Sequence, residues 1–431
     1  MEGNNKIPSV IASYLIILLP IFLITGPLLT DASIVLIDVI FLYYLFKFKD
    51  FKFLDNIYFK YLITFCLIIT IRSLFLNETN HLALSLKSSG LYFRFIILIF
   101  AISYFLEKNV DLMKKFTLIF LITISILILD AYVQFIFGRN LLGFEVINNI
   151  KLNGLFNDRG VLGSYLLRLL PLIFAVIINE YSLKKNKNIL TIILAISMIL
   201  IFLSGSRSSF YLSIFFLFLI MFLFKELRAK IVILLFISII LISILSNFNK
   251  EIDNKINYSF KDPVEQIMST PYNNIKKITF LNKEFYIFTH IYQAHYFTAF
   301  NMFKDNKIFG QGNKMFRILC KKKEFYVNYH SCSTHPHNFY IQLLAENGII
   351  GFVFIFSIFV CIAYLLLREL ISRNIRKVKF FNDPSLFILI GIFINLWPII
   401  PSGNFYNNWL SALIYLPIGF YFYFNKKEKN A

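Results

Sequence analysis

The sequence predicts an all-α, polytopic integral membrane protein. Of its 431 residues, 58% are hydrophobic, 18% are aromatic and only 16% are charged, whereas charged residues make up about a quarter of a typical soluble domain. Apolar runs recur along nearly the whole chain, and a run of about 20 residues crosses a hydrocarbon core of about 30 Å as a helix. One long polar stretch interrupts them. We therefore expect a membrane domain over 1–246, a loop with helices over 247–337 and a second membrane domain over 338–431.

We predict about twelve transmembrane helices, nine before the long loop and three after it. The first is expected to be retained, because no small-residue cleavage site follows its apolar stretch. The spans are 7–29, 30–48, 59–76, 90–106, 115–137, 161–180, 188–204, 209–226, 230–247, 338–367, 385–400 and 408–424.

Lysine and arginine collect on alternate loops, which predicts the orientation because short, positively charged loops stay in the cytoplasm. Both termini are then cytoplasmic, and the long loop lies on the periplasmic side. The net charge of +19 needs no nucleic-acid partner, since much of it sets the topology. The clusters are Lys47, Lys49, Lys52 and Lys60; Lys108, Lys114 and Lys115; Lys184, Lys185 and Lys187; Lys225, Arg228 and Lys230; Arg368, Arg373, Arg376, Lys377 and Lys379; and Lys426, Lys427 and Lys429.

Several predicted spans carry charge near their external ends. Arg72 and Arg94 lie roughly 6 Å below that surface, and Asp130 and Arg168 lie roughly 10 Å below it, at 1.5 Å per residue. Each arginine alone can extend its guanidinium to the headgroups, and the matching depth of Asp130 and Arg168 permits a salt bridge. Because arginines outnumber carboxylates here and unpaired charges are costly in the membrane, a bound anion would also explain them.

The external turn Ser204-Gly205-Ser206-Arg207-Ser208-Ser209 joins two predicted spans. Ser206 or Ser208 can cap the helix that follows. The free N–H groups of that helix, with Arg207 beside them, would form a compact phosphate site. The alternative is a plain helix cap.

Within the long loop, residues 290–303 have helical spacing and carry His295, and Tyr292, Tyr296, Ala299 and Phe303 fall on one apolar stripe. Arg317 adds positive charge further on, which suits an anionic substrate and equally a solvated face.

Cys320 and Cys332 lie in the same loop on the oxidising side of the membrane. We predict that they form a disulfide that fixes the approach to His335, and the alternative is two free thiols.

The segment Thr334-His335-Pro336-His337-Asn338 places imidazoles where the polar loop enters a membrane helix. Imidazole titrates near neutral pH, so a histidine here can take a proton from a hydroxyl. The alternative is an interfacial histidine without a chemical role. Asn338 is expected to cap a short interfacial helix that bends into the membrane at Gly348 and Gly351.

The last external turn, residues 401–409, offers hydrogen-bonding side chains such as Asn404 beside aromatic residues. This combination suits sugar binding, and equally the anchoring of a helix at the membrane interface.

Three motifs resemble the O-antigen ligase and O-antigen polymerase superfamily of bacterial envelope glycosyltransferases, across nearly the full chain. They are Gly205-Ser206-Arg207, Phe309-Gly310-Gln311-Gly312, and His337-Asn338 followed after nine residues by Gly348-Ile349-Ile350-Gly351. The resemblance implies transfer of a glycan from undecaprenyl diphosphate onto a sugar hydroxyl, with inversion, without metal or cofactor, at the periplasmic face of the inner membrane. The acceptor would be lipid A-core in a ligase or a growing glycan in a polymerase.

By this resemblance, Arg207 binds the diphosphate and His337 is the base. The family usually places a second arginine early in the external helix, where this chain has His290 and His295, so His295 or Arg317 would take that role. Arg168, Arg94, Arg72, His335, Asn338 and Asn404 complete the expected substrate-binding set. A lipid-glycan flippase or transporter and a non-catalytic membrane scaffold are the rival interpretations, although a transporter would carry polar residues to the bilayer midplane.

Overall fold

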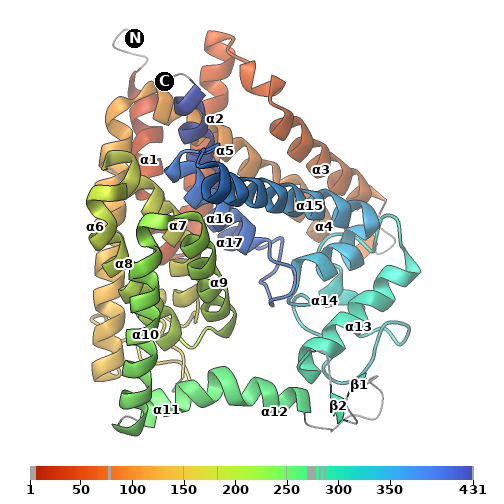
Figure 1. Cartoon of the computed structure of the whole chain (residues 1–431). Coiled ribbons are helices and arrows are strands. Elements are labelled where there is room, and N and C mark those ends of the chain that lie inside the picture. The colour runs from red at the N-terminus through yellow and green to blue at the C-terminus, as the bar shows by residue number, and fades with distance from the viewer. Residues whose placement is uncertain are drawn as a thin grey trace.

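We analysed a computed structural model of the chain, shown in Figure 1. It describes residues 6–75, 79–148, 150–181, 183–248, 250–268, 278–280, 283–285 and 288–429. The described chain is helical apart from one two-stranded hairpin and short bridges, which agrees with the predicted all-α class. The predicted loop 247–337 includes residues 249, 269–277, 281–282 and 286–287, which lie outside this description.

The helices before the long loop make up most of the membrane domain. They are α1 (Lys6–Thr25), α2 (Pro27–Phe48), α3 (Ile57–Leu74), α4 (Leu82–Gly90), α5 (Phe93–Lys108), α6 (Val110–Phe137), α7 (Leu162–Glu180), α8 (Leu183–Leu203), α9 (Arg207–Leu223) and α10 (Lys225–Phe248). Short 3-10 turns lie at Lys52–Asp55, Thr79–His81 and Gly154–Phe156.

The loop and the C-terminal part supply the remaining elements. They are α11 (Lys250–Ile256), a π-helix at Asn257–Lys261, α12 (Asp262–Met268), strands β1 (Ile278–Phe280) and β2 (Lys283–Phe285), α13 (His290–Asp305), α14 (Phe316–Leu319), α15 (Phe339–Ile371), a π-helix at Ser372–Arg376, α16 (Asp383–Asn395) and α17 (Asn408–Lys429). The two strands pair antiparallel, with Ile278 opposite Phe285.

Eight helical segments in the described chain are long and apolar enough to cross a membrane, so the protein is a polytopic membrane protein. Two more apolar helices, α9 and α16, are shorter, and the two remaining predicted spans, 230–247 and 408–424, fall on α10 and α17. The count of twelve stays a prediction. α17 packs along α5, and α16 packs along α7, so the C-terminal helices close the bundle begun by the N-terminal ones.

Figure 1 shows the start of α1 and the end of α17 at one end of the molecule. The helices α11 and α12 lie at the other end, and α13 and α14 lie beneath α15. The loop that carries the candidate histidines is thus away from the chain ends. Which side of the membrane the loop and the termini occupy stays a prediction.

α15 bends where the sequence predicted. Gly348 has a non-helical backbone inside this helix (φ 63°) and separates a first segment, beginning at Phe339, from the long membrane segment. Gly310, in the turn after α13, has a φ of 67°. A Cβ on either glycine would overlap backbone atoms of the other segment. The two glycines therefore allow the chain after α13 to cross α15 in direct backbone contact.

Hydrogen bonds fix this crossing. Gln311 N–H donates to Ala345 O (2.9 Å), and Gly312 N–H donates to Glu346 O (2.8 Å). From the other side, Ile349 N–H donates to Lys307 O (2.8 Å). The loop helix α13 is thereby held against the start of α15, next to the histidines.

Candidate active site

Three histidines and a tyrosine meet where the loop helix α13 faces the segment before α15. The ring centroid of His337 lies 4.1 Å from that of His335 and 5.4 Å from that of His295. The Tyr292 ring, one turn before His295 on α13, lies 5.4 Å from His337. Two segments more than 30 residues apart therefore contribute one aromatic cluster centred on His337. We call His295, His335, His337 and Tyr292 the histidine cluster.

The backbone around His337 is fixed from the C-terminal side of the chain. His337 has a left-handed φ of 59°, unusual for a residue with a side chain. Its carbonyl accepts from Ser402 N–H (2.8 Å), and Ser402 Oγ in turn accepts from Phe339 N–H (2.8 Å). Asn338 caps α15 as predicted, because its Oδ1 accepts from Tyr340 N–H and Ile341 N–H (3.0 and 3.2 Å). These bonds hold the imidazole at the start of the helix.

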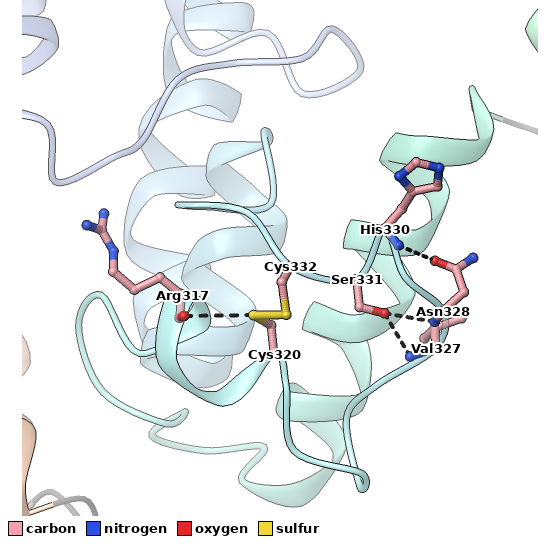
Figure 2. Close-up of a disulfide and its surroundings, with 7 residues drawn as sticks. All are labelled: Arg317, Cys320, Val327, Asn328, His330, Ser331 and Cys332. Carbon is pink, nitrogen blue, oxygen red and sulfur yellow. Dashed lines mark hydrogen bonds between the residues drawn. A yellow bond between two sulfur atoms is a disulfide. The ribbon is translucent and has the colours of Figure 1, made fainter.

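A disulfide holds the same segment from its other side. Cys320 and Cys332 are bonded in the structure, which joins the turn after α14 to the chain just before His335 (Figure 2). Ser331, beside Cys332, accepts from Val327 N–H and Asn328 N–H (2.8 and 2.9 Å). The chain leading to the histidine cluster is therefore tied both covalently and by hydrogen bonds.

Burial keeps the imidazoles of the cluster neutral at neutral pH. It lowers the pKa of His337 below its ordinary value of 6.5. Burial, followed by the charges of His337 and His330, lowers the pKa of His295 to about 4. For His335, burial and then the charge of His337 lower the pKa to about 3. A neutral imidazole keeps one ring nitrogen with a free lone pair, so these groups can accept a hydrogen bond at neutral pH.

The nitrogen atoms of the cluster have few partners. Ser333 Oγ lies 3.1 Å from His337 Nε2, and Thr334 Oγ1 lies 2.9 Å from His335 Nδ1. His295 Nδ1 is buried without a hydrogen-bond partner. No group of three or more His, Cys, Asp and Glu side chains suited to hold a metal ion occurs among the described residues.

Arg207 contacts the segment that joins α11 to α12. It is the first residue of α9, its Nη2 lies 3.4 Å from Asp262 Oδ2, and its guanidinium lies 3.7 Å from the centre of the Tyr258 ring. Burial raises the pKa of Tyr292, and the nearby positive charge of Arg207 opposes that shift. The charge of Arg207 therefore acts on Tyr292, whose ring lies against His337.

The comparison with protein families decides how this arrangement is classified. Residues 192–356 match the family model of the O-antigen ligases. The match confirms the resemblance that the motifs predicted, and it contains both Arg207 and His337. No curated protein matches the chain at a significant level. The match covers less than half of the chain, so it shows that this part of the protein is similar to the O-antigen ligases, and the membrane helices show a polytopic membrane protein.

Within the O-antigen ligase domain, the predicted serine cap of α9 is not made by a side chain. Ser206 occupies the N-cap position without a side-chain bond to the helix backbone. Its Oγ lies 2.8 Å from the Oγ of Ser209 instead, because the hydroxyl of Ser209 one turn later is within reach. The first N–H groups of α9 are thus left to other partners.

Two other predicted arginines are bonded to the protein itself. Arg72 Nη2 donates to Gly310 O (2.9 Å) and so ties the end of α3 to the glycine crossing. Arg94 Nη2 pairs with Asp31 Oδ1 (3.2 Å). Neither contacts the histidine cluster through any described bond. A role for them in substrate binding stays a prediction.

The predicted salt bridge between Asp130 and Arg168 does not form. Asp130 accepts from Asn140 Nδ2 (3.1 Å) and Leu141 N–H (3.0 Å). Arg168 donates to Ser164 O (3.2 Å) on its own helix. Asn140 follows the C-terminal end of α6 and reaches Asp130 easily, so this local pairing replaces the one inferred from matching depth.

Of the remaining predicted residues, Asn404 is hydrogen-bonded within the protein, whereas Arg317 is not paired with any acidic side chain that the structure describes. Asn404 Oδ1 accepts from Gln342 Nε2 (3.1 Å) and from Tyr406 N–H (2.8 Å), so it braces the last external turn against α15. Arg317 forms no ion pair with any described residue, and its Nε is buried without a partner. Arg317 thus retains donors for a ligand.

The position of Tyr292 against the histidines was not predicted from the sequence. We expected it on an apolar stripe, but its ring lies against His337 and His295. Its spacing of one helical turn from His295 could have indicated this, because residues three apart share a helix face. The contact of Arg207 with Tyr258 and Asp262 had no comparable signal, since those residues lie more than 50 positions away.

Proposed function

We propose that the protein transfers a glycan from undecaprenyl diphosphate to a sugar hydroxyl of lipid A-core or of a growing glycan, with inversion. The acceptor oxygen attacks the anomeric carbon of the donor sugar, and the bond between that carbon and the diphosphate oxygen breaks. Undecaprenyl diphosphate leaves, and the hydroxyl proton passes to an imidazole. The step needs no metal ion, because the base and the cationic group together handle the proton and the charge of the leaving group.

In this proposal His337 is the general base. When its Nε2–H donates to Ser333 Oγ, the lone pair is on Nδ1, where it can take the proton of the acceptor hydroxyl. The lowered pKa of His337 keeps this lone pair available at neutral pH. His295 and His335 surround the ring and hold it in a poorly hydrated position.

Arg207 would bind the donor diphosphate. Its guanidinium has five N–H donors, and its only described ion pair, with Asp262, is long (3.4 Å) and involves a partly exposed carboxylate. A diphosphate can replace that carboxylate with shorter, bidentate hydrogen bonds. The unoccupied N–H groups at the start of α9 add to the attraction.

The observation that carries this proposal is that the matched segment 192–356 contains both the histidine cluster around His337 and Arg207, whose charge acts on Tyr292 of that cluster. The test is transfer by purified protein in liposomes, with lipid-linked donor and acceptor. His337→Ala should lower turnover about 10²- to 10⁴-fold, the usual contribution of a general base, and leave donor binding nearly unchanged. His335→Ala is the matched control and should cost less. Equal losses in the two variants would remove the assignment of the base.

We also propose that the site faces the periplasm from the inner membrane, with both termini in the cytoplasm. The alternation of basic loops supports this orientation. Alkaline phosphatase fused near Asn313 should be active, and the same enzyme fused at Lys427 should be inactive. The reverse pair of activities would overturn the orientation.

A further inference from the structure

A second group of cations lies on the His335 side of the histidine cluster. Lys314 lies just before α14, Arg317 lies within α14, and Lys87 lies on α4. Leu82 and Leu84 of α4 pack against a core cluster that contains Met315 and Phe316. A buried hydrogen bond holds the same segment against α3: Asn313 Nδ2 donates to Ser73 Oγ (3.0 Å) at the end of that helix. The fold therefore presses two cationic segments together beside the site.

These positive charges affect one another and the cluster. Burial lowers the pKa of Lys314, and the charges of Arg317, Lys87 and Arg94 lower it further. Arg317 also contributes to the lowered pKa of His335. Phe316, the residue before Arg317, has its ring centroid 6.4 Å from that of His295, so α14 lies beside the histidine cluster.

The acidic groups near these cations do not neutralise them. Asp31 is paired with Arg94. Glu346 opposes the lowering of the Lys314 pKa, but its side chain is fully buried and accepts from Gln342 Nε2 (3.0 Å) and Phe316 N–H (3.1 Å). Within the described chain, Lys87, Lys314 and Arg317 form no ion pair.

Arg317 is the most informative of the three. Its Nε is buried without a hydrogen-bond partner. Figure 2 shows its side chain extending away from the disulfide. A partly buried guanidinium without an acceptor is costly, and a carboxylate or phosphate would satisfy it with two parallel hydrogen bonds.

We propose that Lys87, Lys314 and Arg317 bind an anionic group, a carboxylate or a phosphate, on the acceptor glycan. This proposal rests on the proposed function. The donor diphosphate is assigned to Arg207 at the start of α9, and α9 and α14 lie in different parts of the molecule (Figure 1). The cations beside His335 are left for the second substrate. The protein is then selective for acidic acceptor sugars close to the reacting hydroxyl.

The test compares acceptors that differ only in whether the sugar carries a carboxylate, a phosphate or neither. Arg317→Gln and Lys314→Gln should each raise the acceptor KM at least about 10-fold for an anionic acceptor, as expected for the loss of a charge-assisted hydrogen bond. The KM for the neutral acceptor and for the donor should not change. Lys323→Gln, an exposed lysine of the same loop, is the matched control and should resemble the wild type. The carboxylate and phosphate arms show which anion the site takes.

Three results would overturn the proposal. They are a wild-type enzyme that uses the neutral acceptor equally well, variants that raise the donor KM instead, and an equal loss for charged and neutral acceptors. Arg317→Lys, which retains the charge, should be intermediate and guards against misfolding of the Gln variant.

Failure of the proposed function can be told apart from failure of this inference. If the wild type transfers no glycan, binding of the same acceptors to the protein in nanodiscs still tests whether the cations bind an anionic group. The anionic acceptor should bind at least about 10-fold more weakly to the Lys314→Gln variant than to the wild type. Equal binding would contradict the site.

Discussion

Two arginines, Arg373 and Arg207, show how the scaffold and the candidate site treat the same side chain differently. Arg373, in the π-helix after α15, donates from Nε to Glu369 (2.5 Å), from Nη1 to Asp383 (2.8 Å) and from Nη2 to Phe381 O (2.7 Å). Arg207 has one ion pair at 3.4 Å, and its Nε is buried without a partner. Arg373 is saturated by the protein, whereas Arg207 keeps hydrogen-bonding capacity in reserve. The reserve is what a ligand site requires.

The largest contrast is expected when each arginine is removed. Arg207→Ala should weaken the donor interaction about 10- to 150-fold, corresponding to about 1.5–3 kcal/mol for hydrogen bonds to a charged group. Arg207→Lys should restore only part of it, because an ammonium lacks the bidentate fork. The measurement is the donor KM and turnover in the liposome assay. An Arg207→Ala variant with unchanged donor KM and turnover would place the donor elsewhere.

Arg373→Ala is the matched scaffold variant. It leaves the carboxylate of Glu369 buried without its cation, which should cost about 3–5 kcal/mol of stability. Thermal unfolding in detergent should therefore begin at a lower temperature, while the donor KM of the folded fraction stays unchanged. A raised donor KM in this variant, or an equally destabilised Arg207→Ala, would erase the distinction between the two arginines.

Features set by neighbouring residues could be predicted from the sequence, whereas pairings between distant residues could not. The cap at Asn338, the bend at Gly348 and the approach of the disulfide to His335 depend on neighbouring residues, so local chemistry was enough to predict them. The pairing of Asp130 with Arg168 was inferred from depth alone. Depth says nothing about which way a side chain points around its helix, and a local loop partner was closer.

Contacts between distant segments of the site also could not be predicted from the sequence. The motif Gly310-Gln311-Gly312 and the glycine at 348 could each be recognised, but only the fold shows that they form one backbone crossing. The approach of Lys87 to Lys314 likewise depends on α4 packing against α14. A single sequence carries no signal for either pair.

A smaller effect is expected at Ser333, whose hydroxyl contacts His337 Nε2. Ser333→Ala should lower turnover severalfold, because losing one neutral hydrogen bond of about 0.5–1.5 kcal/mol lets the imidazole adopt the other tautomer. Acceptor KM should change little. Ser333→Thr keeps the hydroxyl and should recover most of the activity. A Ser333→Ala variant with full turnover would show that this contact does not position the base.

The most direct test of the central claim is turnover against pH for the wild type and for His337→Gln. Because burial lowers the pKa of His337 below 6.5, its neutral, proton-accepting form persists to a lower pH than in a solvent-exposed histidine. Wild-type turnover should therefore stay level from pH 8 to below 6.5 and fall only in more acidic solution, and His337→Gln should be impaired at every pH. A Gln variant that restores most activity, with no acid decline in the wild type, would contradict general-base catalysis by His337.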